Sequence, residues 1–401
     1  MQVDHFKKAK ELINIITDKG YQAYIVGGAV RDHFLGHQIN DIDIATSATP
    51  YQIQAIFEKV IPVGIKHGTV IVRYKGESFE VTTFRSESGY SDYRRPDHVS
   101  FVDSIDIDLS RRDFTINAMA LTSTDHLIDP YKGKHDLDQY TIRAVGSPNQ
   151  RFTEDPLRIL RALRFASQLN FRFDEYTYTA IKRLINMVEK LSIERVTVEL
   201  TKLFNGDYVD YGLKCCFDVH LFSHLPIFQD HSDIVDKLKS INKPFKHLID
   251  VIVFLNRTSP QSPSITTWTK AYRLSNRALN NAKHLSYLVN LFEGEGWSNW
   301  LIYQLPENLE QRFIRLIEAL AYECIDRKRV QVLRRSIPIA NQKDIKISGS
   351  DLIKWYPLRE RGPWIHDYLK DIERAVVEAK VTNQIKEIKE WVLKCHPPEK
   401  N

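Results

Sequence analysis

The chain has 401 residues, of which 43% are hydrophobic and 27% are charged, and its formal net charge is +5 at pH 7. A chain of this length and composition builds more than one hydrophobic core, so we expect several domains. The mild basic excess is compatible with a nucleic-acid partner without requiring one, and no run approaches the ~18 apolar residues of a membrane span.

The N-terminus and the cysteines indicate a cytoplasmic protein. Residues 1–16 have the pattern of an amphipathic helix with lysines on its outer face, and they lack the apolar core of a signal peptide. The four cysteines form no CxxC pair, which favours reduced thiols and excludes a structural zinc site of that type.

Strand and helix signals alternate in the first third of the chain. Strands are predicted at residues 24–26, 41–44, 69–74 and 78–84, and helices at 29–35 and 51–60. Lys75-Gly76 is typical of a hairpin turn between the third and fourth of these strands. Residues 85–96 are polar and aromatic without periodicity, which predicts a mobile loop, and a further element starts within 111–121.

After about residue 151 the strand signals largely vanish. A period of 3.6 residues predicts helices at 156–169, 175–184 and 195–204, and the remainder is mostly helical between prolines. The predicted fold class is therefore α+β, with a mixed sheet and helices in an N-terminal head, followed by an all-α remainder.

Paired carboxylates indicate a divalent-metal site in the head. Asp41 and Asp43 alternate along the predicted strand, so both project from one face and can converge on Mg²⁺. Glu80, on a nearby strand, is a candidate third carboxylate. For an isolated DxD the alternative is a turn or cap, and the second such pair, Asp106 and Asp108, is interpreted as a capping or loop segment before a helix at Ser110.

A glycine pair precedes these carboxylates. Gly27 and Gly28 follow a strand and open a helix, which lets the backbone approach a phosphate and offers free N–H groups to it. Arg31 projects from the first turn toward the same anion. The ordered combination with Asp41 and Asp43 predicts triphosphate binding, although a glycine pair alone is more often a simple turn.

The motifs carry a family resemblance. Residues 26–32 (VGGAVRD) with 41–43 (DID) resemble the head of the polymerase-beta nucleotidyltransferase superfamily. Residues 111–118 (RRDFTINA), 154–158 (EDPLR) and 193–200 resemble class II tRNA nucleotidyltransferases, which comprise bacterial-type CCA-adding enzymes and poly(A) polymerase relatives. Residues 347–352 with 361–363 resemble the tail of the CCA-adding branch.

This resemblance implies a catalytic head at 1–140, a neck for nucleobase selection at 141–205, a helical body at 206–325 and a tRNA-binding tail at 326–401. It implies Mg²⁺ on Asp41 and Asp43, CTP and ATP as donors and tRNA as acceptor, with no membrane and no protein partner required. By position, Gly28 and Arg31 match triphosphate contacts. The other matched nucleotide-binding positions are Arg112, Asp113, Asp155, Arg158, Arg161 and Arg164, with Asp113 a candidate acceptor for the ribose 2′-OH.

The nucleobase preference follows from the residue types at 155 and 158. On a helix, Asp155 and Arg158 face the same way, and they offer an acceptor beside a donor. Cytosine and adenine present the complementary edge, whereas uracil and guanine do not. The alternative is an ordinary surface ion pair. Arg158, Arg161 and Arg164 form a basic stripe that favours the functional interpretation, with a solvated position the default for Arg164.

Two expectations concern the rest of the chain. The mobile loop at 85–96, with Tyr90, Tyr93, Arg94 and Arg95, is expected by position in the family to help the pocket change from C to A, the alternative being an ordinary polar loop. Basic residues within 327–335 are expected to contact tRNA phosphates. The predicted function is addition of C, C and A to tRNA, with poly(A) or A-only addition as the alternative.

Overall fold

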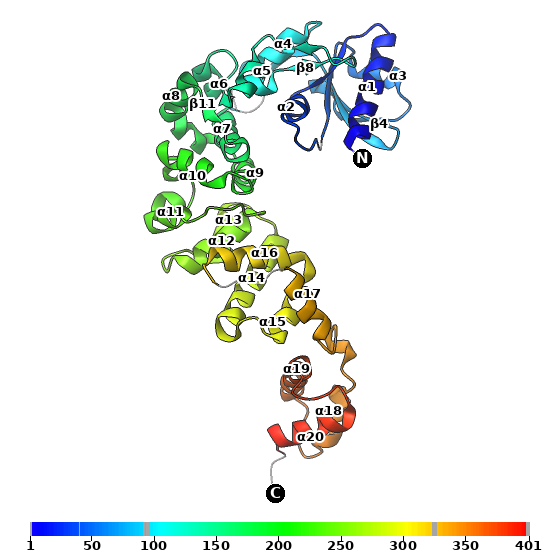
Figure 1. The fold of residues 1–401 in the computed structure, drawn as a ribbon, viewed down its shortest axis with the longest axis vertical. Coiled ribbons are helices and arrows are strands. Elements are labelled where there is room, and N and C mark those ends of the chain that lie inside the picture. The colour runs from blue at the N-terminus through cyan, green and yellow to red at the C-terminus, as the bar shows by residue number, and fades with distance from the viewer. Residues whose placement is uncertain (1, 40, 91–92, 94–95, 323–326, 398–401) are drawn as a thin grey trace. The chain divides into compact units, whose positions relative to one another are not determined.

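The computed structural model describes residues 2–39, 41–90, 93, 96–322 and 327–397, and the chain divides into two compact units (Figure 1). One unit comprises residues 1–248 with 271–273, and the other comprises 249–270 with 274–401. Within the described ranges, no helix is long and apolar enough to cross a membrane. The four-part division expected from the sequence is finer than these two units and stays a prediction.

A seven-stranded mixed sheet forms the start of the first unit, in the order β3-β4-β5-β2-β1-β8-β9. Its strands are β1 (Ala23–Val26), β2 (Asp43–Thr46), β3 (Val60–Gly64), β4 (Thr69–Tyr74), β5 (Glu77–Thr83), β8 (Ala120–Leu121) and β9 (Leu127–Ile128). Neighbours pair antiparallel except β2 with β5. Phe79 and Val81 of β5 are buried whereas Glu80 between them is exposed, so alternation sends apolar side chains inward and carboxylates outward.

Helices flank this sheet, and a two-stranded hairpin lies outside it. The helices are α1 (Gln2–Asp18), α2 (Gly28–Leu35), α3 (Pro50–Ile56), α4 (Ile105–Ser110) and α5 (Gly133–Asp138), and the hairpin pairs β6 (Arg85–Ser88) with β7 (His98–Phe101). Helix α3 starts at a capping box between Thr49 and Gln52. It ends earlier than the predicted residue 60 because Val60 already pairs with β4.

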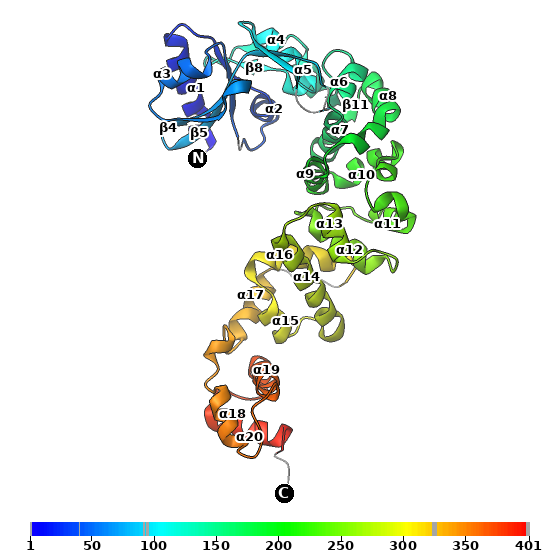
Figure 2. The ribbon, with the colours of Figure 1, turned by 180° about the vertical axis from the view of Figure 1, so that it is seen from behind.

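The rest of the first unit is largely helical, as predicted. Its helices are α6 (Pro148–Glu154), α7 (Leu157–Leu169), α8 (Glu175–Leu184), α9 (Ile193–Phe204), α10 (Val209–Asp218) and α11 (Ser232–Leu238). Helix α7 packs against α6, α9 and α10, and they lie side by side in Figure 1 and in the reverse view of Figure 2. A short parallel pair, β10 (Thr141–Ile142) with β11 (Arg172–Phe173), interrupts the expected all-α neck.

Helices also build the second unit. They are α12 (Leu248–Thr258), α13 (Ile265–Ala271), α14 (Asn276–Glu295), α15 (Asn299–Gln304), α16 (Glu307–Ala319), α17 (Arg327–Ser336), α18 (Gly349–Trp355), α19 (Trp364–Val377) and α20 (Ile385–Cys395). A core that includes Trp300 and Trp364 joins α15, α18, α19 and α20. These two tryptophans are buried, and the described cysteines Cys215, Cys216 and Cys395 are free thiols.

The structure confirms the fold class and the hairpin at Lys75-Gly76, with β4 and β5 on either side. Two details of the sequence interpretation are wrong. Strand β2 begins at Asp43, so Asp41 precedes it rather than lying on it. Residues 85–88 form strand β6 instead of opening a loop, because β7 supplies a pairing partner ten or more residues later, beyond the window in which periodicity is visible.

Candidate nucleotide-binding site

The glycine pair lies where β1 ends and α2 begins. Gly27 has φ +72°, a conformation that side chains disfavour, and a Cβ there would lie 2.8 Å from Nη1 of Arg112. The backbone therefore passes directly beside a guanidinium, an approach that glycine permits. Gly28 follows as the first residue of α2, whose initial N–H groups have no helical acceptors and favour an anion.

Arg31 is oriented by its neighbours on α2 and on the RRDFTINA segment. Its guanidinium donates to the carboxylate of Asp32 at 2.9 and 3.0 Å and to Oδ1 of Asn117 at 2.8 Å. The guanidinium carbon lies 5.1 Å from the ring centroid of Phe165 on α7. Arg31 is therefore fixed between the sheet and the neck helices before any ligand binds.

Asp43 and Glu80 are neighbours across the parallel pair of β2 and β5, whose register sets their Cα atoms opposite each other. Partial desolvation raises the pKa of Asp43, and the charge of Asp41 adds to this shift while Arg112 opposes it. Partial desolvation also raises the pKa of Glu80, although its side chain is exposed, with a further increase from the charge of Asp43. The carboxylates thus repel one another, a situation that a bound divalent cation relieves.

This donor set fits a magnesium ion shared with a substrate. Among the described residues, no three Asp, Glu, His or Cys side chains converge into a complete metal site. Magnesium in phosphoryl-transfer sites commonly takes one or two protein carboxylates together with phosphates and waters. Asp41 and Asp43 are sufficient protein ligands for such an ion, and a preformed site with Glu80 as a third ligand is not present in this part of the chain.

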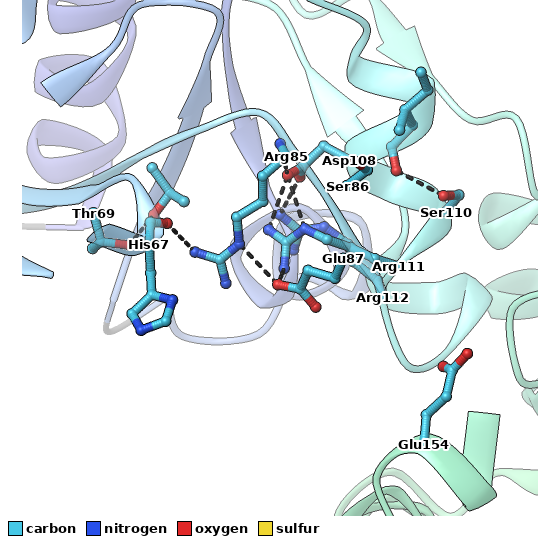
Figure 3. A network of polar contacts seen from close by, with 12 residues as sticks. His67, Thr69, Arg85, Ser86, Glu87, Asp108, Ser110, Arg111, Arg112 and Glu154 are labelled. Carbon is cyan, nitrogen blue, oxygen red and sulfur yellow. Dashed lines mark hydrogen bonds and ion pairs between the residues drawn. The ribbon is translucent and has the colours of Figure 1, made fainter. Parts of the chain in front are cut away.

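Asp108 gathers two arginines behind the pocket (Figure 3). Its buried carboxylate accepts hydrogen bonds from Nε and Nη2 of Arg111 at 3.0 and 2.9 Å, and from Nη2 of Arg112 at 3.4 Å. Glu87 of β6 accepts from Arg111 at 3.1 Å and from Arg85 at 2.8 Å. Burial lowers the pKa of Arg112, and the charge of Asp108 opposes that shift.

The sequence interpretation of residues 106–108 is therefore wrong. These residues lie inside α4, which begins at Ile105 and ends at Ser110, so Ser110 closes a helix rather than starting one. A helix of six residues carries too little periodicity to be recognised from the sequence. Asp108 was not predicted to support this site. The nearby pair Arg111 and Arg112 was the signal that could have identified it.

Asp155 and Arg158 reach the pocket by a different route from the predicted one. Asp155 ends α6 in an extended conformation and α7 starts at Leu157, so the pair does not share a helical face. The carboxylate of Asp155 accepts from Leu157 N at 3.1 Å and from Nη2 of Arg195 at 3.0 and 3.2 Å. Arg158 donates to the carbonyl of Arg111 at 3.0 Å and to Glu154 at 3.2 Å. Pro156 explains the break, since it disfavours a helical residue before it.

Arg161 and Arg164 continue along α7. Arg161 donates to Asp113 at 2.6 Å, and Arg164 is 6% exposed and ion-paired with Glu199 of α9 at 3.2 Å. Burial lowers the pKa of Arg164 to about 10, with the charge of Arg161 adding to the effect. The expectation that Arg164 is solvated is wrong, because α9 covers it and supplies its counterion. Within the described residues, its Nε has no hydrogen-bond partner.

Asp113 is held by three donors. It accepts from Phe114 N at 2.8 Å, from Nδ2 of Asn117 at 3.1 Å and from Arg161. Burial alone would raise the pKa of Asp113, but Arg161 and the hydrogen bond from Asn117 hold it well below its usual range. The side chain is thus a fixed, ionised acceptor at the junction of the head and α7.

One pocket of about 600 Å³ brings most of these residues together, within the range of small-molecule sites. Nine of the eleven predicted site residues line it: Gly28, Arg31, Asp43, Arg112, Asp113, Asp155, Arg158, Arg161 and Arg164. Asp41 and Glu80 lie outside its lining. Sequence reasoning missed six lining side chains: Asn117, Leu157, Phe165, Gln168, Arg195 and Lys202. Asn117, Leu157 and Arg195 lie inside quoted motifs, which was the signal available for them.

The charges of the pocket wall are largely paired. Each arginine that lines it has a carboxylate partner, in the pairs Arg31–Asp32, Arg112–Asp108, Arg158–Glu154, Arg161–Asp113, Arg164–Glu199 and Arg195–Asp155. Among the described residues, the charged lining groups Asp43 and Lys202 have no ion pair. The positive charges around a bound triphosphate are therefore largely neutralised by protein carboxylates. Added cations beside Asp43 would offset the negative charge of the triphosphate.

The hairpin of β6 and β7 approaches the neck beside this pocket. The hydroxyl of Tyr90 donates to Glu87 at 2.8 Å, and Nζ of Lys190 donates to the hydroxyl of Tyr93 at 3.0 Å. Arg94 and Arg95, which the sequence also singled out, lie outside the described residues. The role of this segment in changing nucleotide preference stays a prediction.

Part of the basic stretch in the second unit is ion-paired. Glu310 of α16 is buried and pairs with Arg327 and Arg334 of α17, each at 3.2 Å. Lys328 and Arg335 on the same helix are exposed. The arginines paired with Glu310 fix α17 to α16. The prediction of phosphate contacts therefore narrows to exposed cations outside these pairs, such as Lys328 and Arg335.

Comparisons with known proteins agree along the chain. Residues 23–143 match a family model described as the poly A polymerase head domain, residues 170–231 match a probable RNA and SrmB binding site of polymerase A, and residues 250–392 match a putative second domain of tRNA nucleotidyltransferases. The CCA-adding enzyme of Oceanobacillus iheyensis is 43% identical over 99% of both chains. That of Bacillus cereus is 37% identical over 98% of this chain and 100% of the relative. The solved Bacillus stearothermophilus CCA-adding enzyme in complex with CTP superposes with a TM-score of 0.85 at 32% identity, covering 97% of both chains.

Proposed function

The chain belongs to the CCA-adding enzyme family, and on this premise we propose how its pocket performs the family reaction. The enzyme adds C, C and A to the 3′ end of tRNA from CTP and ATP, and releases pyrophosphate. The observation that carries the proposal is the single pocket in which Gly28, Arg31 and Asp43 of the head meet Asp155 and Arg158 of the neck. One side of it suits a triphosphate, and the other suits a nucleobase.

The triphosphate binds along the head side of the pocket. Gly27 and Gly28 let the backbone approach it, and the free N–H groups at the start of α2 donate to its oxygens. Arg31 and Arg112 add guanidinium donors from fixed positions. Arg161 and Arg164 extend this row of cations along α7, while Asp113, as a fixed acceptor, is placed to receive the ribose 2′-OH.

The nucleobase is selected by Asp155 and Arg158 in place of a template. Asp155 keeps acceptor capacity after its bonds from Leu157 and Arg195, and Arg158 keeps N–H donors after its bonds to Arg111 and Glu154. The carboxylate accepts a hydrogen bond from the exocyclic amino group of cytosine or adenine. The guanidinium donates a hydrogen bond to the adjacent ring nitrogen of the same base. Uracil and guanine leave both the carboxylate and the guanidinium without a hydrogen-bond partner, at a cost of ~1–3 kcal/mol each. Cytosine and adenine are therefore preferred over uracil and guanine by roughly two to four decades.

The chemical step is in-line attack of the tRNA 3′-OH on the α-phosphate. The new bond joins the 3′ oxygen to the α-phosphorus, and the bond between the α-phosphorus and the bridging oxygen breaks to release pyrophosphate. Asp41 and Asp43 would hold magnesium, which supplies charge stabilisation for the attacking and leaving oxygens. Glu80, in register with Asp43, orients the attacking hydroxyl and accepts its proton as the bond to phosphorus forms. Arg31 and Arg112 offset the charge that develops on the triphosphate.

The remaining parts of the chain hold the acceptor. Exposed cations of α17, such as Lys328 and Arg335, contact tRNA phosphates without reading sequence. We place this reaction in the cytoplasm, on the similarity of the chain to bacterial CCA-adding enzymes. The head alone does not separate CCA addition from poly(A) synthesis, since it matches a poly A polymerase model, and similarity over the full length favours CCA addition.

The test is an extension assay on a tRNA transcript that lacks its 3′ CCA. The transcript is incubated with magnesium and each nucleoside triphosphate, singly and in pairs, and products are resolved to one nucleotide. The proposal predicts two additions with CTP alone, one more when ATP follows, and none from UTP or GTP, with all extension lost in Asp43→Ala. A ladder of adenosines on any RNA would assign poly(A) synthesis instead, and extension by Asp43→Ala would refute the proposed metal site.

A further inference from the structure

A buried carboxylate lies behind the pocket wall and contacts no solvent. Asp108 of α4 is 0% exposed, and every hydrogen-bond partner of its carboxylate among the described residues belongs to the β6 strand or to the pair Arg111 and Arg112. A buried carboxylate costs free energy unless it is paired and hydrogen-bonded. Asp108 meets that requirement with two guanidinium groups and the backbone N–H of Arg85, at 3.3 Å.

The first arginine held by Asp108 points into the pocket. Arg112 lines the pocket, and its Nη1 lies 2.8 Å from where a Cβ of Gly27 would be. Its Nη2 lies 3.4 Å from Asp108, whereas its Nε is buried without a partner in the part of the chain that the structure describes. Asp108 thus holds this guanidinium from one side, through Nη2, while Nη1 lies beside the glycine turn that lines the pocket.

The second arginine leads to the nucleobase side. Arg111 is not among the residues that line the pocket, and its side chain is turned toward Asp108 and Glu87 (Figure 3). Its backbone carbonyl, however, accepts the hydrogen bond from Nη2 of Arg158 at 3.0 Å. The position of the Arg111 main chain therefore sets where the guanidinium of Arg158 sits, and the side chain of Arg111 anchors that main chain.

We propose that Asp108 is a positioning residue that fixes both Arg112 and Arg158 from behind the pocket wall. It acts on Arg112 directly and on Arg158 through Arg111. Triphosphate binding and base selection thereby depend on one buried carboxylate. It holds Arg158, which reads the base, at a fixed distance from Arg112, which contacts the phosphates. The inference rests on the proposed function, in which Arg158 reads the base.

The informative variant is Asp108→Asn, which keeps the shape of the side chain and removes its charge. An amide keeps one acceptor oxygen but replaces the other with an NH2 group that a guanidinium cannot accept, so Arg111 and Arg112 can no longer both be held by one charged group. We expect kcat/KM for CTP to fall ten- to a hundredfold. We also expect the preference for CTP over UTP to fall at least tenfold, because Arg158 loses its fixed position.

Two further variants make the test decisive. Arg111→Gln removes the anchor without touching the pocket lining, and it stands in if Asp108→Asn does not fold. Asp136→Asn is the matched control, because Asp136 is also a buried carboxylate of the head, 2% exposed, which accepts from Thr115 at 2.7 Å and from Arg143 at 3.1 Å away from the pocket. All variants are compared with the wild type for CTP and UTP incorporation and for thermal unfolding.

The expected result is a loss of CTP-over-UTP preference in Asp108→Asn and Arg111→Gln, with Asp136→Asn losing stability but keeping its preference. If Asp108→Asn and Arg111→Gln keep the wild-type preference, Asp108 is merely structural and the inference is wrong. If the wild type itself does not prefer CTP and ATP, the proposed function fails instead, so the two failures are distinguishable.

Discussion

Replacement of Gly27 by alanine tests the close approach between the glycine turn and Arg112. A Cβ at Gly27 would lie 2.8 Å from Nη1 of Arg112 and 3.9 Å from Oδ2 of Asp43, with φ at +72°. The backbone conformation of Gly27, φ +72° and ψ −135°, is one that side chains rarely adopt, and it costs an alanine about 1–3 kcal/mol. The guanidinium must also move, which removes a charge-assisted hydrogen bond to the triphosphate worth about 1.5–3 kcal/mol. We therefore expect KM for CTP to rise roughly ten- to 150-fold.

Gly76→Ala is the matched control for this prediction. Gly76 has φ +84° in the hairpin of β4 and β5, and a Cβ there would meet nothing within 4 Å. Both variants carry the backbone penalty, which chemical denaturation measures, but the clash belongs to Gly27 alone. Steady-state CTP incorporation then separates the two effects. If Gly27→Ala and Gly76→Ala lose equal stability and both keep the wild-type KM, the argument for Arg112 as a triphosphate contact is refuted.

Three other predictions concern the neck side of the pocket. Glu199→Gln leaves Arg164 buried and unpaired and should lower the free energy of unfolding by about 3–5 kcal/mol in urea titrations, and a change below about 1 kcal/mol would contradict the ion pair. Arg195→Gln removes the donor that fixes Asp155 and should lower kcat/KM for CTP about tenfold or more, with UTP incorporation little changed. Lys202→Gln should raise KM for CTP by several-fold at low salt and less at high salt, and an unchanged KM at low salt would remove Lys202 from the site.

The sequence alone predicts the helices and turns whose pattern depends only on residues close together in the chain. The hairpin at Lys75-Gly76 and the helices α7, α8 and α9 follow from turn chemistry and periodicity, and the structure confirms them. Most of the predicted site residues also meet in one pocket, because the glycine pair and the arginine stripe are readable without a partner. Their individual roles stay predictions.

What the sequence did not reveal depends on partners far along the chain. Arg164 is buried because α9 supplies Glu199, and β6 forms because β7 pairs with it. Asp155 lies outside α7, so its approach to Arg158 comes from the bend between α6 and α7 rather than from helical spacing. The burial of Asp108 is likewise not visible in the sequence, although its two arginine partners, Arg111 and Arg112, follow closely along the chain.

In the proposed function, protein side chains select the base without a template. Equilibrium binding of CTP, ATP, UTP and GTP to the wild type and to Asp155→Asn, in magnesium and without RNA, tests it directly. We expect the wild type to bind CTP and ATP roughly two decades or more tighter than UTP and GTP, and Asp155→Asn to lose most of this difference. Equal affinities of the wild type for all four nucleotides would contradict it.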